Sequence, residues 1–192
     1  LINQKFEYEM NAPNESEGYT EVFAWGADRY GQLGLGNKHK GRCYCVPRFC
    51  TFNVIIRKVA CGDEHSAFIT NNGSVYTMGS NADGRLGIGD RSMKLSSTPC
   101  LVEGLSWFKA MEISCGWGHT AVTIDNGKVF TWGVGEYGAL GLGDTEAQWI
   151  PVKVLKDVFI VNVSCGTRHT AIVDDKGSLY VCGSGDTGQL GT

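Results

Sequence analysis

The sequence predicts an all-β protein, a β-propeller built from four-stranded blades. Glycines that end one strand of each unit recur at intervals of 53, 54 and 50 residues, at Gly26, Gly79, Gly133 and Gly183. A repeat of about 50 residues is typical of propellers and related arrays. Glycine supplies 27 of the 192 residues, about twice its usual share of ~7%, which indicates many tight turns. At this period the chain holds between three and four blades, as an open arc or as part of a larger ring.

The strands of one unit are clearest in the last repeat. Three apolar, β-branched segments follow one another there, at 159–166, 169–175 and 177–183. In the earlier units a proline precedes the outermost segment, at Pro47, Pro99 and Pro151. Proline cannot donate to a sheet ladder, so it marks an edge strand. Each unit therefore has four antiparallel strands, as a propeller blade does.

Two of the predicted hairpins carry an Asn-Gly pair, at 72–73 and 126–127, and a third carries the weaker Lys176-Gly177. Asn-Gly is the pair most favoured in two-residue turns, in which both central residues have positive φ. We expect such a turn between the second and third strands of each blade.

A second recurring element is Gly-x-Leu-Gly, which follows the third strand of each unit. Its glycines, among them Gly34, Gly87 and Gly141, permit backbone conformations closed to other residues. Its leucines are expected to anchor the connection in the apolar space between blades, and they are Leu33, Leu86 and Leu140. A phosphate-binding loop is the competing interpretation. Such loops need a helix N-terminus behind them, whereas a polar loop and a proline follow here.

The third recurring element is Cys-Gly-x-x-His. Its histidines, His65, His119 and His169, are copies of one position. A catalyst needs one unique constellation, so repetition favours a structural role. We expect each imidazole to hydrogen-bond to neighbouring backbone and to fix the turn into the next strand.

Two positions between the glycine and the histidine vary while the frame is constant. They are Asp63-Glu64, Trp117-Gly118 and Thr167-Arg168. A constant scaffold with variable loops is how binding surfaces are built. The predicted protein-binding loop face consists of Asp63, Glu64, Trp117 and Arg168. For Trp117 two interpretations stay open, a protein-binding anchor or a partly buried packing residue.

Composition excludes other classes of site. Cys61, Cys115 and Cys165 occupy equivalent positions, so we interpret them as reduced packing residues. A Cys-x-Cys cluster at Cys43 and Cys45 has no second pair of ligands nearby, as a zinc site would require. No metal and no cofactor is therefore predicted.

The net charge of -3 gives no basic surface for nucleic acid. No window of 18 apolar residues exists that could cross a membrane. Residues 1–20 form a non-repeat leader without the basic and apolar regions of a signal peptide. We expect an intracellular, cytoplasmic location, with the nucleus and the cilium as alternatives.

Neither the Gly-Gly pair of kelch repeats nor the Trp-Asp pair of WD repeats occurs in the chain. The composite motif instead resembles the repeat of the regulator of chromosome condensation (RCC1-like) family. The segments that carry the resemblance are 22–36, 61–90, 115–144 and 165–191, and the resemblance covers residues 21–192. It implies a propeller of about seven blades. The remaining blades are then expected from the rest of a longer chain, or their place is taken by a covering partner.

The resemblance also bears on function. The nuclear family member that exchanges nucleotide on a small GTPase uses acidic and histidine side chains in the variable slot, and Asp63 matches that pattern whereas Trp117 and Thr167 do not. Its protruding β-hairpin insertion has no counterpart here, since the stretches between Gly-x-Leu-Gly and the next Cys-Gly hold only 24, 25 and 21 residues. Plant ultraviolet receptors of the family place tryptophans in the slot on adjacent blades. Here Trp117 is the one tryptophan in the three slots, because the adjacent slots hold Asp63 and Thr167.

We therefore expect a non-enzymatic protein-protein interaction propeller, a regulatory or scaffolding module of a larger protein. A small-GTPase regulator or guanine-nucleotide exchange factor is the first alternative. A structural component of a large assembly, for example a ciliary one, is the second. The expected partner is a protein, with a small GTPase as one candidate.

Overall fold

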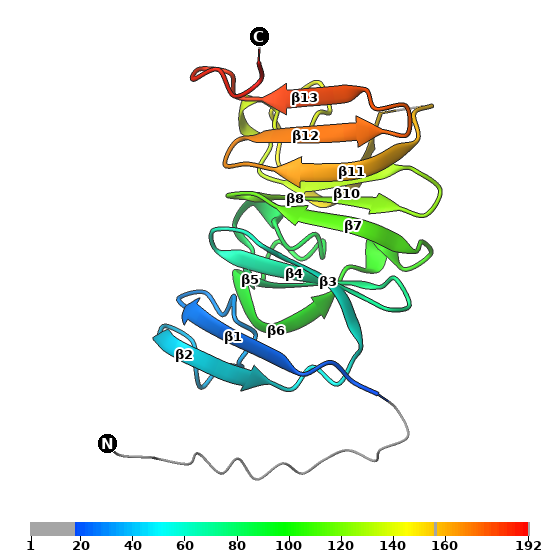
Figure 1. Cartoon of the computed structure of the whole chain (residues 1–192). Coiled ribbons are helices and arrows are strands. Elements are labelled where there is room, and N and C mark those ends of the chain that lie inside the picture. The colour runs from blue at the N-terminus through cyan, green and yellow to red at the C-terminus, as the bar shows by residue number, and fades with distance from the viewer. Residues whose placement is uncertain (1–17, 156, 192) are drawn as a thin grey trace, which may run out of the picture.

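The computed structural model describes residues 18–155 and 157–191, and these fold into thirteen strands in four antiparallel sheets. The sheets are stacked in chain order (Figure 1). The first contains β1 (Val22–Ala27) and β2 (Cys43–Cys50). The second contains β3 (Ile56–Cys61), β4 (His65–Thr70), β5 (Val75–Ser80) and β6 (Leu95–Leu101). The third contains β7 (Ala110–Cys115), β8 (His119–Ile124), β9 (Val129–Gly133) and β10 (Gln148–Val154). The fourth contains β11 (Ile160–Cys165), β12 (His169–Asp174) and β13 (Leu179–Gly183).

Each sheet is one blade, so the predicted all-β propeller architecture is confirmed. The second and third blades are complete. By its motif, β1 is equivalent to β5 and β9, so the first blade consists of an outer pair of strands. The fourth blade consists of the inner three. The described segment therefore presents an open sheet face at each end of the stack.

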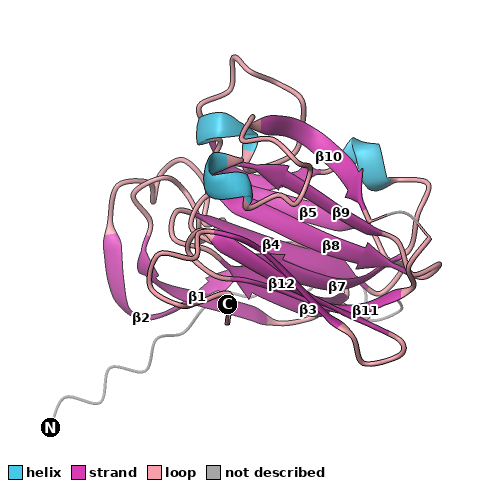
Figure 2. Ribbon diagram, turned by 90° about the horizontal axis from the view of Figure 1, so that it is seen from above, coloured by secondary structure: helices cyan, strands magenta, loops and turns pink. Residues whose placement is uncertain are grey.

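The prolines mark edge strands, as predicted, but they lie within the outermost strands rather than before them. Pro99 lies in β6 and Pro151 in β10, and each of these strands pairs on one side only. Three one-turn 3₁₀ helices follow β5, β6 and β9, on the side of the sheets where β10 lies (Figure 2), and each contacts the following blade. They are η1 (Ala82–Gly84), η2 (Glu103–Leu105) and η3 (Glu136–Gly138). Within the described residues no helix is long and apolar enough to cross a membrane.

The hairpin turns differ from the prediction. Only their glycines have positive φ, for example 90° at Gly73, while Asn72 does not. The Thr70 amide donates to the Ser74 carbonyl at 3.0 Å, and the Gly73 amide donates to the Thr70 carbonyl at 2.9 Å. This is a three-residue loop that ends in a left-handed glycine. The expectation of a two-residue turn was wrong because this longer loop needs only one residue in the left-handed region.

The Gly-x-Leu-Gly element lies between blades. Leu86 and Leu140 are fully buried, and Leu33, at the open end of the stack, is half-buried. Gly87 has φ of +70°, and a Cβ there would lie 2.5 Å from Nε1 of Trp132. The glycine thus meets two requirements at once, a left-handed backbone and close contact with a buried aromatic ring.

The Cys-Gly-x-x-His glycines are explained by close contact between neighbouring blades. A Cβ on Gly62 would lie 2.4 Å from the carbonyl oxygen of Gly116, and a Cβ on Gly116 would lie 2.3 Å from that of Gly166. Such distances leave no room for any side chain. The repeated glycine therefore sets how closely the inner strands of successive blades approach one another.

Candidate functional site

The repeated histidines connect one blade to the next. Nε2 of His65 lies 2.8 Å from Oγ1 of Thr120, and Nε2 of His119 lies 2.9 Å from Oγ1 of Thr170. The Thr170 hydroxyl donates to the Ala139 carbonyl at 2.7 Å, so the imidazole is the donor to the hydroxyl. The partner of each Nε2 is thus a threonine side chain and not the expected backbone group. Each imidazole contacts the threonine that directly follows the equivalent histidine in the next blade.

Burial lowers the pKa of His65 to about 3 and that of His119 to about 4. The positive charge of Arg85 adds to the lowering of the pKa at His65, and the neighbouring His169 adds to it at His119. Both rings are therefore neutral near pH 7. Because they are 0% and 1% exposed, neither can reach a substrate. Their hydrogen bonds connect each blade to the next one.

The variable slots meet on one surface. Trp117 is half-buried, and two guanidinium groups lie near its ring, with Cζ of Arg85 at 5.6 Å and Cζ of Arg168 at 5.7 Å from the ring centre. Cζ of Arg168 also lies 5.1 Å from the ring centre of Tyr137. Guanidinium groups at such distances are attracted by the electron density of an aromatic face. We call Glu64, Arg85, Trp117, Tyr137 and Arg168 the loop-face cluster.

Arg85 is the buried base of the loop-face cluster. Its side chain is 3% exposed and pairs with Glu64 through an Nη1–Oε2 distance of 3.2 Å. Its Nε donates to the Ala82 carbonyl at 3.0 Å, and Nη1 donates to the Trp117 carbonyl at 3.3 Å. A buried cation needs such partners to offset its lost hydration. Arg85 therefore fixes the backbone that carries Trp117.

Arg168 forms the exposed part. Its Nη1 donates to the Tyr137 hydroxyl at 3.4 Å. Tyr137 is 49% exposed and has φ of +60°, an uncommon conformation for a bulky residue. The third and fourth blades thus each supply one member to a contact that crosses between them.

Of the predicted loop-face residues, the structure brings Glu64, Trp117 and Arg168 into one cluster. Asp63 is exposed beside it. Arg85 and Tyr137 were missed, because they belong to the variable positions of the Gly-x-Leu-Gly connection rather than to the slot. The available signal was their position: Arg85 precedes Leu86 and Tyr137 precedes Gly138, in the connections that lie against the next slot.

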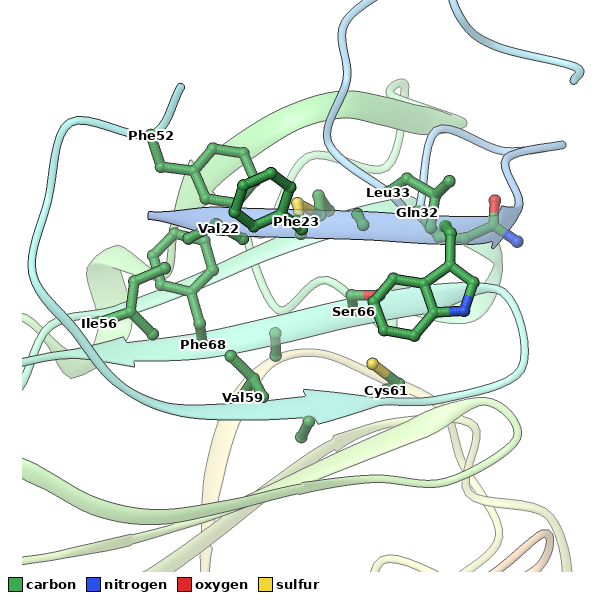
Figure 3. A pocket seen from close by; sticks show the side chains of 15 residues that line it. Val22, Phe23, Gln32, Leu33, Phe52, Ile56, Val59, Cys61, Ser66 and Phe68 are labelled. Carbon is green, nitrogen blue, oxygen red and sulfur yellow. The ribbon is translucent and has the colours of Figure 1, made fainter. Parts of the chain in front are cut away.

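A groove of about 330 Å³ lies at the open end of the stack, between β1 and the face of β3 and β4 (Figure 3). Val59, Cys61, Ser66 and Phe68 line it from β3 and β4, and Phe23 lines it from β1. In the complete blades, β4 pairs with β5 and β8 with β9. The groove therefore takes the place that an inner strand pair would occupy beside β1.

The eight cysteines are all free thiols. Burial raises the pKa of Cys165 to about 12 and that of Cys115 well above its usual range. Cys61 is exposed, contrary to the expected packing role, because no inner strand pair covers it at this end. Across residues 18–155 and 157–191, no three metal-binding side chains are placed to share an ion.

Stacked four-stranded blades tied through repeated glycines and histidines define a repeat propeller. Residues 21–192 match the family model described as RCC1-like domain. The chain belongs to this family.

Individual relatives support the same assignment. The chain is 34% identical over 139 residues to the ultraviolet-B receptor UVR8 of Arabidopsis thaliana, covering 72% of this chain and 31% of the receptor. It is 37% identical over 134 residues to the secretion-regulating guanine nucleotide exchange factor of Bos taurus, covering 68% of this chain and 28% of that protein. It is 40% identical over 124 residues to the X-linked retinitis pigmentosa GTPase regulator homolog of Caenorhabditis elegans, covering 65% of this chain and 9% of that protein. The chain thus spans about a third or less of these relatives.

Among solved structures, Prp20p of Saccharomyces cerevisiae superimposes with a TM-score of 0.77 at 26% identity, covering 90% of this chain and 43% of that one. That structure was described together with the binding of Prp20p to Gsp1p and histones. Human WBSCR16 gives a TM-score of 0.70 at 28% identity, covering 81% of this chain and 40% of that one.

Proposed function

We propose that the chain is a non-enzymatic interaction module whose loop face binds a protein partner. The observation that carries the proposal is the loop-face cluster, in which a half-buried tryptophan is flanked by two arginines at the variable positions of the repeat. Tryptophan and arginine are the residues most enriched at binding hot spots. The ion pair between buried Arg85 and half-buried Glu64 holds this surface in place before any partner arrives, which reduces the entropy lost on binding.

A partner can be sought with the protein carrying a photo-crosslinking amino acid at position 63, which is exposed beside the cluster. With the crosslinked partner in hand, we expect Trp117→Ala to weaken its binding about thirtyfold, as loss of a hot-spot anchor does. The melting temperature should change little.

Trp107 provides the matched control. It is 93% exposed and lies near the opposite end of the blades, two residues before Lys109, which contacts the Gly73 turn. Trp107→Ala should leave binding unchanged. A Trp117→Ala protein that unfolds more easily yet binds as before would show that Trp117 is a packing residue.

Regulation of a small GTPase, including nucleotide exchange, is the second candidate. Its support is that one relative is named as a guanine nucleotide exchange factor and another as a GTPase regulator homolog, together with the exposed carboxylate of Asp63. An acidic loop residue would compete for the lysine and the magnesium ion that hold the nucleotide phosphates.

The exchange hypothesis is tested by stopped-flow release of labelled nucleotide from a panel of small GTPases. We expect acceleration by the wild-type protein and its loss in Asp63→Ala. If no GTPase in the panel releases nucleotide faster, the exchange function is rejected and the interaction module remains.

A further inference from the structure

We propose that Arg168 binds a carboxylate group of the partner, so that the loop face recognises an acidic protein segment. The inference rests on the proposed function and names the chemistry of its partner. It is carried by a difference between the two arginines of the loop-face cluster.

Arg85 already has its anion. Its guanidinium pairs with Glu64 at 3.2 Å and donates to two backbone carbonyls, so its donors are directed into the protein. At 3% side-chain exposure, it cannot reach a partner. Its role is to position Trp117.

Arg168 is exposed and lies between blades with aromatic rings as its neighbours, at 5.1 Å from Tyr137 and 5.7 Å from Trp117. Among residues 18–155 and 157–191, no carboxylate lies within ion-pairing distance of it. Its one side-chain hydrogen bond there, to the Tyr137 hydroxyl at 3.4 Å, uses a single N–H group. An arginine guanidinium has five N–H donors in a fixed plane.

Aromatic neighbours restrict this side chain without neutralising it. The flexible arm loses less entropy on binding when it is already held, and the planar fork remains available for two parallel N–H···O bonds. Such a geometry matches a carboxylate.

The surrounding charge favours a singly charged anion over a phosphate. Glu136 is exposed next to Tyr137, and Asp63 is exposed on the same face. A doubly charged phosphate is usually bound by several cations, and repulsion from these carboxylates would oppose it. A side-chain carboxylate or a chain-terminal carboxylate carries half that charge.

The test uses three short peptides and the whole chain labelled with ¹⁵N. The first peptide has one central glutamate and blocked ends, the second has glutamine instead, and the third has glutamine and a free C-terminal carboxylate. The readout is the Nε–Hε signal of Arg168, which is identified by its disappearance in Arg168→Lys. The buried Arg85 signal serves as an internal reference.

We expect the glutamate peptide, the free-carboxylate peptide or both to shift the Arg168 signal. Which of these two peptides shifts it shows whether the carboxylate is that of a side chain or of a chain terminus. The blocked glutamine peptide should leave the signal in place. Arg168→Gln should weaken peptide binding about tenfold or more, and Arg168→Lys should weaken it less, because it keeps the charge but loses the fork. Melting temperatures should be unchanged. If no peptide shifts the signal, or if inorganic phosphate shifts it and the peptides do not, the inference is overturned.

Failure of this inference can be told from failure of the proposed function. A partner that needs Trp117 but binds Arg168→Gln as well as wild type overturns the carboxylate inference and leaves the interaction module in place. A partner indifferent to Trp117→Ala overturns the proposed role of Trp117 as the binding anchor, whereas the peptide titration still reports directly on Arg168.

Discussion

Copies of the same motif lie at the interface between the second and third blades and at the open end beside the first blade. Their cysteine is buried at the interface and exposed at the open end. In the closed interface, Cys115 is buried and the Thr120 hydroxyl accepts a hydrogen bond from His65. At the open end, the equivalent Cys61 is exposed, and Ser66, the counterpart of Thr120, lines the groove.

This difference teaches that the motif stabilises the fold through the neighbouring blades rather than within its own blade. His119 is buried because Thr170 and the fourth blade cover it. His169 has the same sequence context, but no blade follows it among the described residues, and it is only half-buried. In repeat proteins much of the stability comes from such nearest-neighbour interfaces.

The largest expected effect is on the pH dependence of folding. The folded-state pKa values of His65 and His119 are about 3 and about 4, against 6.5 for an ordinary histidine. Below pH 6.5 the unfolded chain therefore binds protons that the folded chain does not. This stability is fully present above pH 6.5 and is lost as the pH falls toward the folded-state values.

From these pKa values, each of the two histidines should cost about 2 kcal/mol of unfolding free energy between pH 7 and pH 5. Urea unfolding at a series of pH values measures this loss. His119→Gln should remove about half of it. A flat unfolding free energy between pH 5 and pH 7 would contradict the burial of these rings.

The next effect compares the closed and open copies directly. His119→Ala should lower the unfolding free energy by about 3 kcal/mol, because it removes a buried ring and an interblade hydrogen bond. His169→Ala, at the open face, should cost less than about 1 kcal/mol. Denaturant unfolding of both variants tests this, with His119→Gln as a milder substitute should the alanine variant fail to fold. Equal losses would mean that the motif acts within its own blade.

The fold could be predicted to this extent because its determinants are local and repeated. The left-handed backbone at Gly87 and the edge position of Pro99 are properties of single residues. The partner of His65 could not be predicted in the same way. Its choice of Thr120 depends on the spacing between blades, which no single repeat encodes.

The same reasoning explains the candidate site. The slot was recognisable because the residue at the position of Trp117 differs between repeats, whereas the flanking Cys-Gly and His are the same in each. Arg85 and Tyr137 were not, because their contacts cross from one blade to the next. The exposure of Cys61 results from its place at the open end of the stack. The motif could not predict it, because the motif is the same in every repeat.

The smallest expected effect involves no change in stability. A thiol-reactive maleimide should label Cys61 at least about tenfold faster than Cys115, because an exposed thiol needs no opening of the fold whereas a buried one does. Mass spectrometry of the digested protein assigns each label to its cysteine. Equal rates at the two positions would show that the third blade opens as readily as the end of the stack. Strong protection of Cys61 would show instead that a strand pair covers the groove in solution. Cys115 is buried under such a strand pair, and Cys61 differs from it by lacking one.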